Sequence, residues 1–266
     1  AGSNTFRIET LARRDGSSYR LNGSKTFITG ADVADKMLVV ARTTSAAECK
    51  DQGLPKVFGL SLFLIDTRVP GLELHQIPTQ GIEGMKQFTV FFNDVVVPAD
   101  RLIGEPDQGA MILFNCLNPE RILAAASALG ISEHLIAKSV DYARERSIFG
   151  KNPIGAYQAI QHPLARLKIE AEAVRLLTYK AAWAFDQAQD PSDVGVTANM
   201  AKFLAAELAV NAADRAIQIH GGYGFSLEYG IIQYWTNVRL LKTAPISQEL
   251  VLNFIGEHVL GMPRSF

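Results

Sequence analysis

One carboxylate in the chain stands where it could act as a general base. In the segment NPERILAAASALG, residues 118–130, Glu120 precedes a run that contains only Ile, Leu, Ala, Ser and Gly beyond Arg121. A dry apolar setting raises the pKa of a carboxyl group towards neutrality, which suits a base that removes a proton from a substrate. The same residues also predict an ordinary helix start, with Asn118 as N-cap, Pro119 as the first helical residue and an acid in the first turn. Local spacing leaves both interpretations open.

Two further segments could hold a phosphate group. The glycines of HGGYGF, residues 220–225, would let the backbone approach a phosphate or a flat ring, and RERSIFGK, residues 144–151, offers Arg146. Each segment also has a structural interpretation, as a glycine-rich helix C-cap or as cations that complement a helix C-terminus. HGGYGF is not a G-x-G-x-x-G that follows a strand, so a Rossmann site is not indicated. KTFITG, residues 25–30, is by itself an ordinary strand end.

Composition narrows the classes of function. A chain of 266 residues that is 48% apolar can form one large domain or two ordinary ones with a sizeable core. The net charge of −1, without a Lys/Arg-rich run, argues against a nucleic-acid partner and against an electrostatic membrane anchor. No apolar stretch reaches the ~18 residues that a membrane-spanning helix needs. Cys49, Cys116 and the five histidines lack metal-ligand or redox spacing, so no metal site is predicted and a reducing compartment is expected.

The elements that would position these residues change in kind along the chain. Residues 1–105 contain extended runs separated by turn pairs such as DG, NG and PG, which predicts an antiparallel β-barrel or sandwich domain. A polar loop is expected at residues 43–56. The predicted strands lie within residues 5–14, 19–30, 36–43, 57–66, 72–78 and 88–97.

The second part, residues 106–266, has helical periodicity. Apolar residues at i, i+3 and i+4 steps predict helices that begin near residue 118, cover about 160–185 and 194–219, and run from Ser247 to Gly261. Four helices of this length predict a C-terminal four-helix bundle. The expected fold class is therefore α+β, with two domains that meet between residues 105 and 106.

The motifs in their order resemble the flavin-dependent acyl-CoA dehydrogenase family over essentially all 266 residues. Members of that family combine an N-terminal helical domain, a middle β-domain and a C-terminal four-helix bundle. The chain begins inside the family's T-E-P-x-A-G-S segment, so we expect it to lack the N-terminal helical domain. The matching segments are AGSNTF, KTFITG, FFNDVVVPADRLIG, NPERILAAASALG, YARERSIFGK, AYQAIQH, QIHGGYGF and SQELVLNFIGEHVLG.

The resemblance implies FAD as the cofactor. Ser3 matches a serine near the flavin pyrimidine, and Thr29 matches the threonine of a W-I-T motif that contacts the isoalloxazine ring. Phe27 stands where many members have Trp. In the family the bundle of a neighbouring subunit binds the adenosine end of FAD, which implies a homo-oligomer, usually a tetramer built as a dimer of dimers. The cofactor-binding positions matched in the second part are Arg146, Phe149, Gln158, Gln218, Gly222 and Gln248.

The position of the base is the most informative point of the resemblance. Many members carry it as the Glu of an E-G-T-S segment, where this chain has APIS; Pro245 takes that position without a gap, and Ala244 takes it with one deletion. We prefer Ala244, because it keeps a backbone N–H for the thioester carbonyl, which proline lacks. The isovaleryl- and long-chain branch carries its Glu on the first bundle helix instead, and the isovaleryl type has E-R there and Ala in the loop. The resemblance thus implies Glu120 as the base, Ala244 as the oxyanion donor, and Asn118 and Arg121 as substrate-binding residues.

The implied activity is α,β-dehydrogenation of an acyl-CoA to the 2-enoyl-CoA, in fatty-acid or branched-chain catabolism. The resemblance favours a branched acyl group, such as an isovaleryl-like or citronellyl-like group, or a medium or long linear one, with electron-transfer flavoprotein as the electron acceptor. Two alternatives stay open: a flavin oxidase on the same fold, and a non-catalytic fragment that only assembles. We expect a bacterial cytoplasmic protein, or a mitochondrial matrix protein in a eukaryote.

Overall fold

The computed structural model describes residues 2, 4–55, 57–82 and 84–264, so Ser3 lies outside the described residues. The chain divides into two compact units, Ala1–Cys116 and Leu117–Phe266, and each is described by itself below. The division falls inside a long helix, later in the chain than the boundary between residues 105 and 106 that the sequence suggests.

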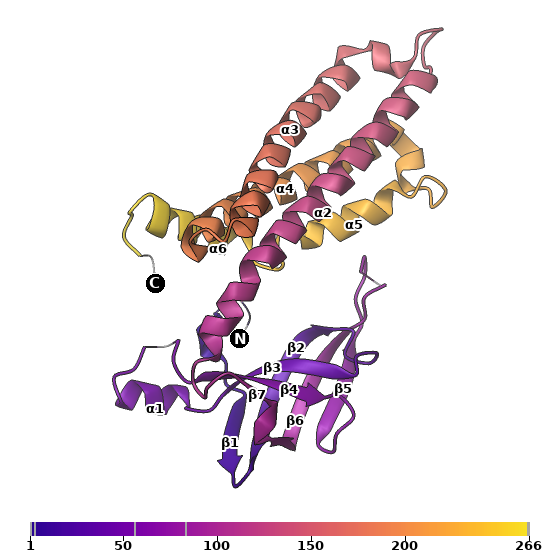
Figure 1. The fold of residues 1–266 in the computed structure, drawn as a ribbon. Helices are drawn as coiled ribbons and strands as arrows, with labels where there is room; N and C mark the ends of the chain where they lie inside the picture. The colour runs from indigo at the N-terminus through magenta and orange to yellow at the C-terminus, as the bar shows by residue number, and fades with distance from the viewer. Residues whose placement is uncertain (1, 3, 56, 83, 265–266) are drawn as a thin grey trace. The chain divides into compact units, whose positions relative to one another are not determined.

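The first unit is built on one seven-stranded sheet with the strand order β5-β6-β2-β1-β3-β4-β7 (Figure 1). Neighbouring strands are antiparallel, except that β1 and β3 pair in parallel at Leu11 and Arg42. The predicted β-domain is therefore confirmed as a mixed sheet. Its strands are β1 (Leu11–Asp15), β2 (Ser18–Thr29), β3 (Lys36–Arg42), β4 (Leu60–Asp66), β5 (Leu72–Ile77), β6 (Gln87–Pro98) and β7 (Leu102–Ile103).

The core of this unit comes from alternating residues of the central strands. Leu21 of β2, Phe63 of β4 and Phe92 of β6 are fully buried, as expected where one face of each strand packs inwards. The pairing of β2 with β6 shifts register twice, between Leu21 and Gly23 and between Lys25 and Ile28. The second shift lies within the KTFITG motif near the end of β2, and irregularities of this kind change the direction of a strand locally.

The predicted polar loop at residues 43–56 contains a short helix, α1 (Ala46–Asp51). Ser45 Oγ accepts a hydrogen bond from the Glu48 N–H at 3.2 Å, and the Glu48 carboxylate accepts one from the Ser45 N–H at 2.7 Å. This reciprocal pair is a capping box, and its S-x-x-E pattern is present in the sequence. The expectation of a loop throughout residues 43–56 was therefore wrong at Ala46–Asp51, where the capping box starts a helix.

The second unit is helical, and the predicted bundle helices are confirmed (Figure 1). One further helix, α5, was not predicted, because its β-branched and aromatic residues resemble a strand. The last predicted helix begins after Ser247, whose hydroxyl caps it, and continues into a wider turn at Ile255–Val259. The helices are α2 (Gly109–Glu145, which starts in the first unit), α3 (Gln158–Asp186), α4 (Pro191–His220), α5 (Ile231–Leu240) and α6 (Gln248–Phe254).

The start of α2 corrects the interpretation of Asn118 as a helix cap. The helix begins at Gly109, so Asn118, Pro119 and Glu120 lie inside it. Pro119 lacks an N–H and removes one helical hydrogen bond, yet the apolar residues before it continue the helix. Asn and Pro together give the same local signal at a true helix start and at this interior position.

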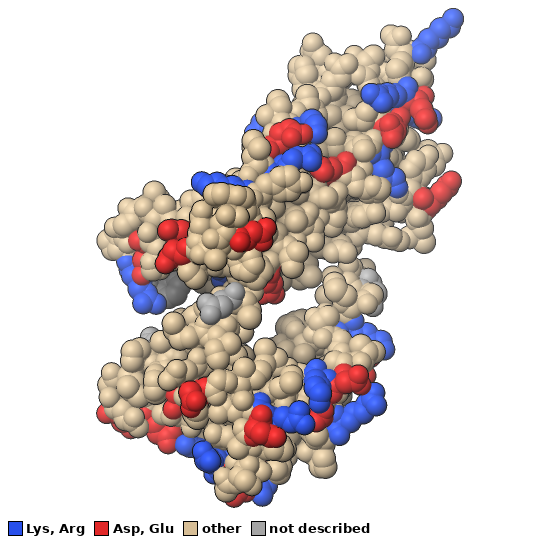
Figure 2. All heavy atoms as spheres, viewed as in Figure 1, with Lys and Arg blue, Asp and Glu red and all other residues tan. Residues whose placement is uncertain are grey.

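Surface charge and hydropathy add two observations. On the face drawn in Figure 2, basic and acidic side chains are interspersed over both units. Among the described residues, none of the helices combines the length and the hydropathy that crossing a bilayer requires.

Candidate functional site

Asn118, Glu120 and Arg121 share one turn of α2. The buried Asn118 side chain donates from Nδ2 to the carbonyl of Pro191, at the first residue of α4, over 2.8 Å. Its Oδ1 lies 3.4 Å from Nη1 of Arg121, and a Cβ at Gly195 would lie 3.2 Å from the same oxygen. This turn of α2 is therefore fixed against the start of α4 by a side chain that the neighbouring glycine accommodates.

The electrostatics of this turn differ from the expectation for Glu120. The side chain of Glu120 is exposed in this chain, so the helical unit alone does not supply the dry apolar wall that the sequence suggested. Burial lowers the pKa of Arg121, and the Glu120 carboxylate acts in the opposite direction. A carboxylate with a guanidinium beside it on a fixed helical turn can accept a proton from a group brought to it.

Ala244, the predicted oxyanion donor, lies in the segment that follows α5. The Ala244 N–H donates to the carbonyl of Leu240 at 2.9 Å. Pro245 has no N–H at all. The amide predicted to bind a thioester carbonyl is thus already used in a helix-terminal hydrogen bond, and its role as an oxyanion donor is not supported in this conformation.

A hollow of about 470 Å³ in the helical unit has Arg146 and Gly222 in its wall. Tyr142 and His220 line it too, and their rings stack with centroids 4.4 Å apart. Burial lowers the pKa of His220, and its Nδ1–H donates to the Ala216 carbonyl at 2.7 Å. A guanidinium, stacked rings and an exposed glycine backbone are chemically suited to a phosphate joined to a flat ring system.

The other bundle residues predicted to bind the cofactor do not line this hollow. Phe149 is 99% exposed and has a positive φ of 59°, while Gln158 and Gln218 are exposed as well. Gln248 is buried at the start of α6, in a different region of the unit. The structure therefore joins Arg146 with Gly222 and leaves the remaining predicted positions dispersed.

Phe27 and Thr29 lie at the end of β2 in the first unit. Phe27 has a φ of 56° and a side chain that is 64% exposed, next to the register shift in β2. A bulky residue with this backbone is uncommon, and such conformations concentrate at binding sites. The Thr29 hydroxyl donates to Oε1 of Gln87 at 3.1 Å. An exposed aromatic face beside a fixed hydroxyl suits a flat ring with polar edges, so the residues present fit a flavin.

The first unit contains another hollow, which the sequence did not predict. It measures about 690 Å³, and Asn4, Arg7 and Lys25 line it together with residues 8–10 and 23–24. Burial lowers the pKa of Lys25 to about 8. Lys25 belongs to the quoted KTFITG motif, but a strand pattern alone gives no sign that it faces a hollow.

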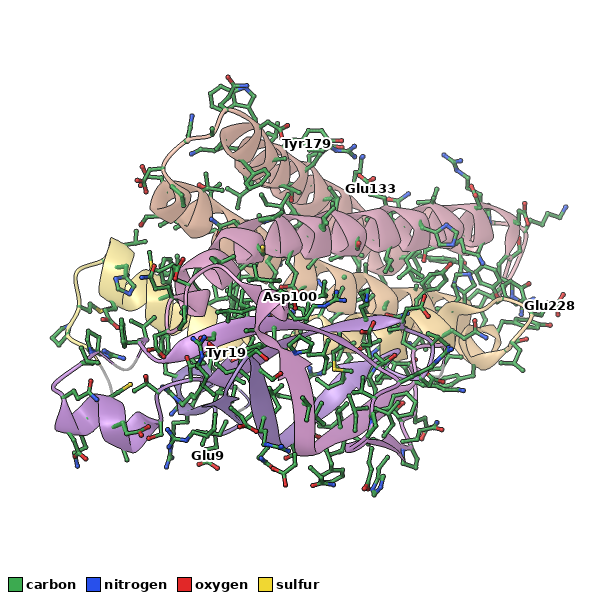
Figure 3. The ribbon with its side chains drawn as sticks, turned by 60° about the horizontal axis from the view of Figure 1, so that its bottom comes forward. Glu9, Tyr19, Asp100, Glu133, Tyr179 and Glu228 are labelled. Carbon is green, nitrogen blue, oxygen red and sulfur yellow. The ribbon has the colours of Figure 1, made fainter. Side chains whose placement is uncertain are left out.

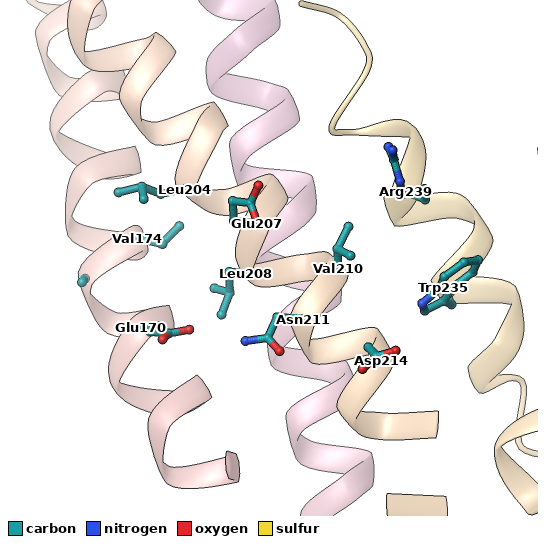
Figure 4. Close-up of a pocket in the computed structure, with 11 residues that line it drawn as sticks. Glu170, Val174, Leu204, Glu207, Leu208, Val210, Asn211, Asp214, Trp235 and Arg239 are labelled. Atoms are coloured by element: carbon teal, nitrogen blue, oxygen red, sulfur yellow. The ribbon is translucent and has the colours of Figure 1, made fainter. Parts of the chain in front are cut away.

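A third hollow, about 740 Å³, lies among α3, α4 and α5 (Figure 4). Its walls contain none of the residues predicted to bind FAD or substrate. Glu170, Glu207 and Asp214 contribute three carboxylates against one guanidinium, from Arg239, which disfavours a phosphate-bearing ligand. Within the described residues, no group of three or more His, Cys, Asp or Glu side chains could hold a metal ion.

Comparison with known sequences identifies the family. Residues 1–95 match the middle domain of acyl-CoA dehydrogenases, and residues 107–260 match their C-terminal domain. A strand-rich unit followed by this helical unit defines the catalytic-domain pair of a flavoprotein oxidoreductase class. The chain belongs to the acyl-CoA dehydrogenase family, whose members are FAD-dependent.

Individual relatives agree with this assignment. The chain is 43% identical over 266 residues to acyl-CoA dehydrogenase FadE12 of Mycobacterium tuberculosis. The aligned region is 100% of this chain and 66% of that relative. Butyryl-CoA dehydrogenase of Megasphaera elsdenii superimposes with a TM-score of 0.89 at 32% identity, over 98% of this chain and 65% of that one. The FAD complex of PigA gives a TM-score of 0.90 at 28% identity, over 98% and 65%. The chain thus spans slightly less than two thirds of the length of the proteins it matches.

Proposed function

We propose that the chain carries the flavin and base sites of an enzyme that dehydrogenates an acyl-CoA thioester to the 2-enoyl-CoA. The single observation that carries the proposal is the turn of α2 on which Glu120 stands exposed beside Arg121, held to Pro191 by the buried Asn118. Many family members are expected to carry the base in the loop before the last helix. In this chain that position is Ala244 or Pro245, and neither has a carboxylate. Membership of the acyl-CoA dehydrogenase family supplies the reaction class.

In this proposal Glu120 removes the proton from the α-carbon of the acyl group. Its exposure leaves the carboxylate accessible to a ligand, and a bound acyl chain would exclude water from it, which strengthens it as a base. Arg121 sets a positive charge beside the carboxylate, while Asn118 fixes the turn that carries both. In this proposal Asn118 and Arg121 hold and orient Glu120, the proton acceptor.

Several residues of the chain would bind FAD. Phe27 and Thr29 at the end of β2 offer an aromatic face and a hydroxyl to the ring system, and Arg146 with Gly222 offers a guanidinium and open backbone to the diphosphate end. We include Ser3, Phe149, Gln158, Gln218 and Gln248 on the strength of the family resemblance. Bound FAD supplies the two-electron acceptor for the hydride that leaves the β-carbon.

The proposal includes an acyl group, an electron acceptor and a compartment. A branched or a medium to long acyl group is supported by the position of Glu120 on α2 rather than before α6. A homo-oligomer with electron-transfer flavoprotein as acceptor follows the family resemblance, and a bacterial cytoplasm is supported by bacterial relatives. A panel of acyl-CoAs of varied length and branching, scored by the rate of flavin bleaching, ranks the substrates.

The decisive variant is Glu120→Gln. We expect it to bind FAD and acyl-CoA like the wild type, while the rate of flavin bleaching falls by about 10²–10⁴-fold because the proton acceptor is lost. Stopped-flow absorbance of the flavin measures that rate, and the absorbance of the purified protein reports FAD content. Asp141→Asn, which removes an exposed carboxylate farther along α2, is the control and should bleach normally.

Flavin bleaching, FAD content and oxygen consumption together separate the alternatives. Normal bleaching in Glu120→Gln would remove Glu120 from the mechanism. Oxygen consumption that keeps pace with turnover would indicate a flavin oxidase. A wild-type preparation that contains no FAD and takes none up would indicate a non-catalytic chain.

A further inference from the structure

A lysine is enclosed in the interior of the helical unit. Lys202 of α4 is only 1% exposed, although most buried neighbours along that helix are alanines. An ammonium group held away from water is unfavourable unless it is paired or hydrogen-bonded. Its Nζ donates to the backbone carbonyl of Ile246, in the segment between α5 and α6. The hydrogen-bond acceptor of the buried Lys202 ammonium group is thus a main-chain oxygen.

The segment that Lys202 contacts, residues 241–247, is tied to α4 at two points. At its start, Nζ of Lys242 lies 2.6 Å from the carboxylate of Glu207 on α4. At its end, Lys202 holds the carbonyl of Ile246. The N–H of Gln248, the first residue of α6, donates to the Lys242 carbonyl at 3.2 Å and closes the loop. Of the two ties to α4, only the one at Lys202 is inside the protein.

The charges around Lys202 do not favour its ammonium form. Burial lowers the pKa of Lys202 to about 8, Arg121 of α2 acts in the same direction, and Glu249 of α6 opposes both. Arg121 stands next to Glu120, so the buried lysine lies within electrostatic reach of the turn that carries the candidate base. An apolar side chain of similar volume would fill this space without the desolvation penalty. What such a side chain could not do is hold the Ile246 carbonyl.

We propose that Lys202 is a positioning residue, which fixes the Ala244–Ile246 backbone against α4 so that this segment keeps one conformation. Its role in catalysis rests on the proposed acyl-CoA dehydrogenation, in which this segment corresponds to the one that carries the base in other family members. The structural part of the proposal does not depend on that function.

The test compares wild type with Lys202→Met, which keeps an unbranched apolar side chain in the same space and removes the donor. Hydrogen–deuterium exchange should show the amides of residues 243–248 exchanging about tenfold faster or more, because a hydrogen bond from a charged donor is lost. The amides in the middle of α3 should be unchanged. In the FAD-loaded enzyme, bleaching by a saturating acyl-CoA should slow about tenfold while FAD content stays the same.

Two variants control for general effects. Leu208→Ala opens a cavity in the core beside the same helix and keeps the donor at Lys202. Lys168→Met removes an exposed lysine of α3. Neither should speed exchange at residues 243–248 relative to the rest of the unit. Lys202→Arg restores a charged donor and should bring the segment back to within about threefold of the wild-type exchange rate.

Each outcome supports or overturns the positioning role of Lys202. Unchanged exchange at residues 243–248 in Lys202→Met, or equal loosening in Leu208→Ala, overturns the positioning role. If Lys202→Met does not fold, Lys202→Gln, whose shorter side chain cannot reach as far, is measured with the same expectation. A wild type that no acyl-CoA bleaches, combined with a loosened segment in Lys202→Met, would overturn the proposed function and leave the positioning intact.

Discussion

Phe27 combines a strained backbone with an exposed side chain. Its left-handed φ of 56° disfavours any residue with a Cβ by about 1–2 kcal/mol, and its ring is 64% exposed. Little packing stabilises this arrangement within the described part of the first unit. Strain that the unit does not itself require is a mark of a binding position.

We predict that Phe27→Gly changes FAD affinity more than stability. Relief of strain and the greater freedom of the unfolded glycine oppose each other, so the free energy of unfolding should stay within about 1 kcal/mol of wild type. FAD affinity should fall, because the aromatic face is lost. Denaturant unfolding and a flavin fluorescence titration measure the two effects.

Phe88→Ala provides the contrast, since Phe88 is buried in the core of the same unit. It should destabilise the protein by about 3–5 kcal/mol. A loss of similar size in Phe27→Gly would show that Phe27 is an ordinary packing residue.

The helix α1 carries a pH-dependent contribution to stability. The Ser45 hydroxyl and then Arg13 lower the pKa of the Glu48 carboxyl from 4.5 to about 2. Because the folded-state pKa lies below the unfolded one, the contribution is complete above pH 4.5 and is lost as the pH falls through that range towards 2. The side chain is exposed, so salt should weaken the part that comes from Arg13.

The corresponding prediction concerns Glu48→Gln. Its free energy of unfolding should change less steeply between pH 4.5 and pH 2 than that of the wild type, as measured by urea titrations at a series of pH values. Ser45→Ala should flatten the same region and weaken the helix by about 1 kcal/mol. Identical pH dependence in all three proteins would remove Glu48 from this role.

The elements also show how far the sequence could lead. The strands and the long helices followed from periodicity, and the family resemblance followed from motifs such as KTFITG and HGGYGF. The start of α2 did not, because Asn118 and Pro119 look alike at a helix start and inside a helix that packing sustains. Helix α5 was missed since IIQYWTNVRL has strand-like propensity that tertiary contacts override.

The candidate site was predictable only in part, for a physical reason. The family resemblance implied Arg146 and Gly222 as cofactor-binding residues, and the fold brings them to one hollow. The occupied N–H of Ala244 and the burial of Lys202 depend on contacts between segments far apart in the chain. No local pattern distinguishes Lys202 from the lysines that extend into solvent from other helices.

At the scale of the whole molecule, α3 leaves an apolar row uncovered. Ile169, Leu176, Tyr179 and Trp183 are all more than half exposed and follow one face of the helix. Figure 3 shows Tyr179 on the surface of the helical unit. A row of this kind typically marks an association surface, which agrees with the homo-oligomer of the proposed function.

We therefore predict that Leu176→Asp dissociates the assembly. Leu176 is 72% exposed, so the charge should leave the fold of one subunit intact while opposing burial against another. Size-exclusion chromatography with light scattering measures the mass of the assembly. Leu260→Asp alters an exposed leucine near the end of the chain and should keep the wild-type mass. An unchanged mass in Leu176→Asp would show that the row is not the association surface.

The continuity of α2 has a consequence for dissecting the protein. In a helix each N–H bonds four residues back, so the N–H groups of Leu117, Asn118 and Glu120 take their acceptors from residues 113, 114 and 116. These acceptors precede the boundary between the compact units. A gene cut at that boundary would turn the interior of α2 into a fraying end. Asn118 and Pro119 would then stand at a real helix start, and the hydrogen bond from Asn118 to Pro191 would compete with capping. An expression fragment of the helical unit should therefore begin before Gly109.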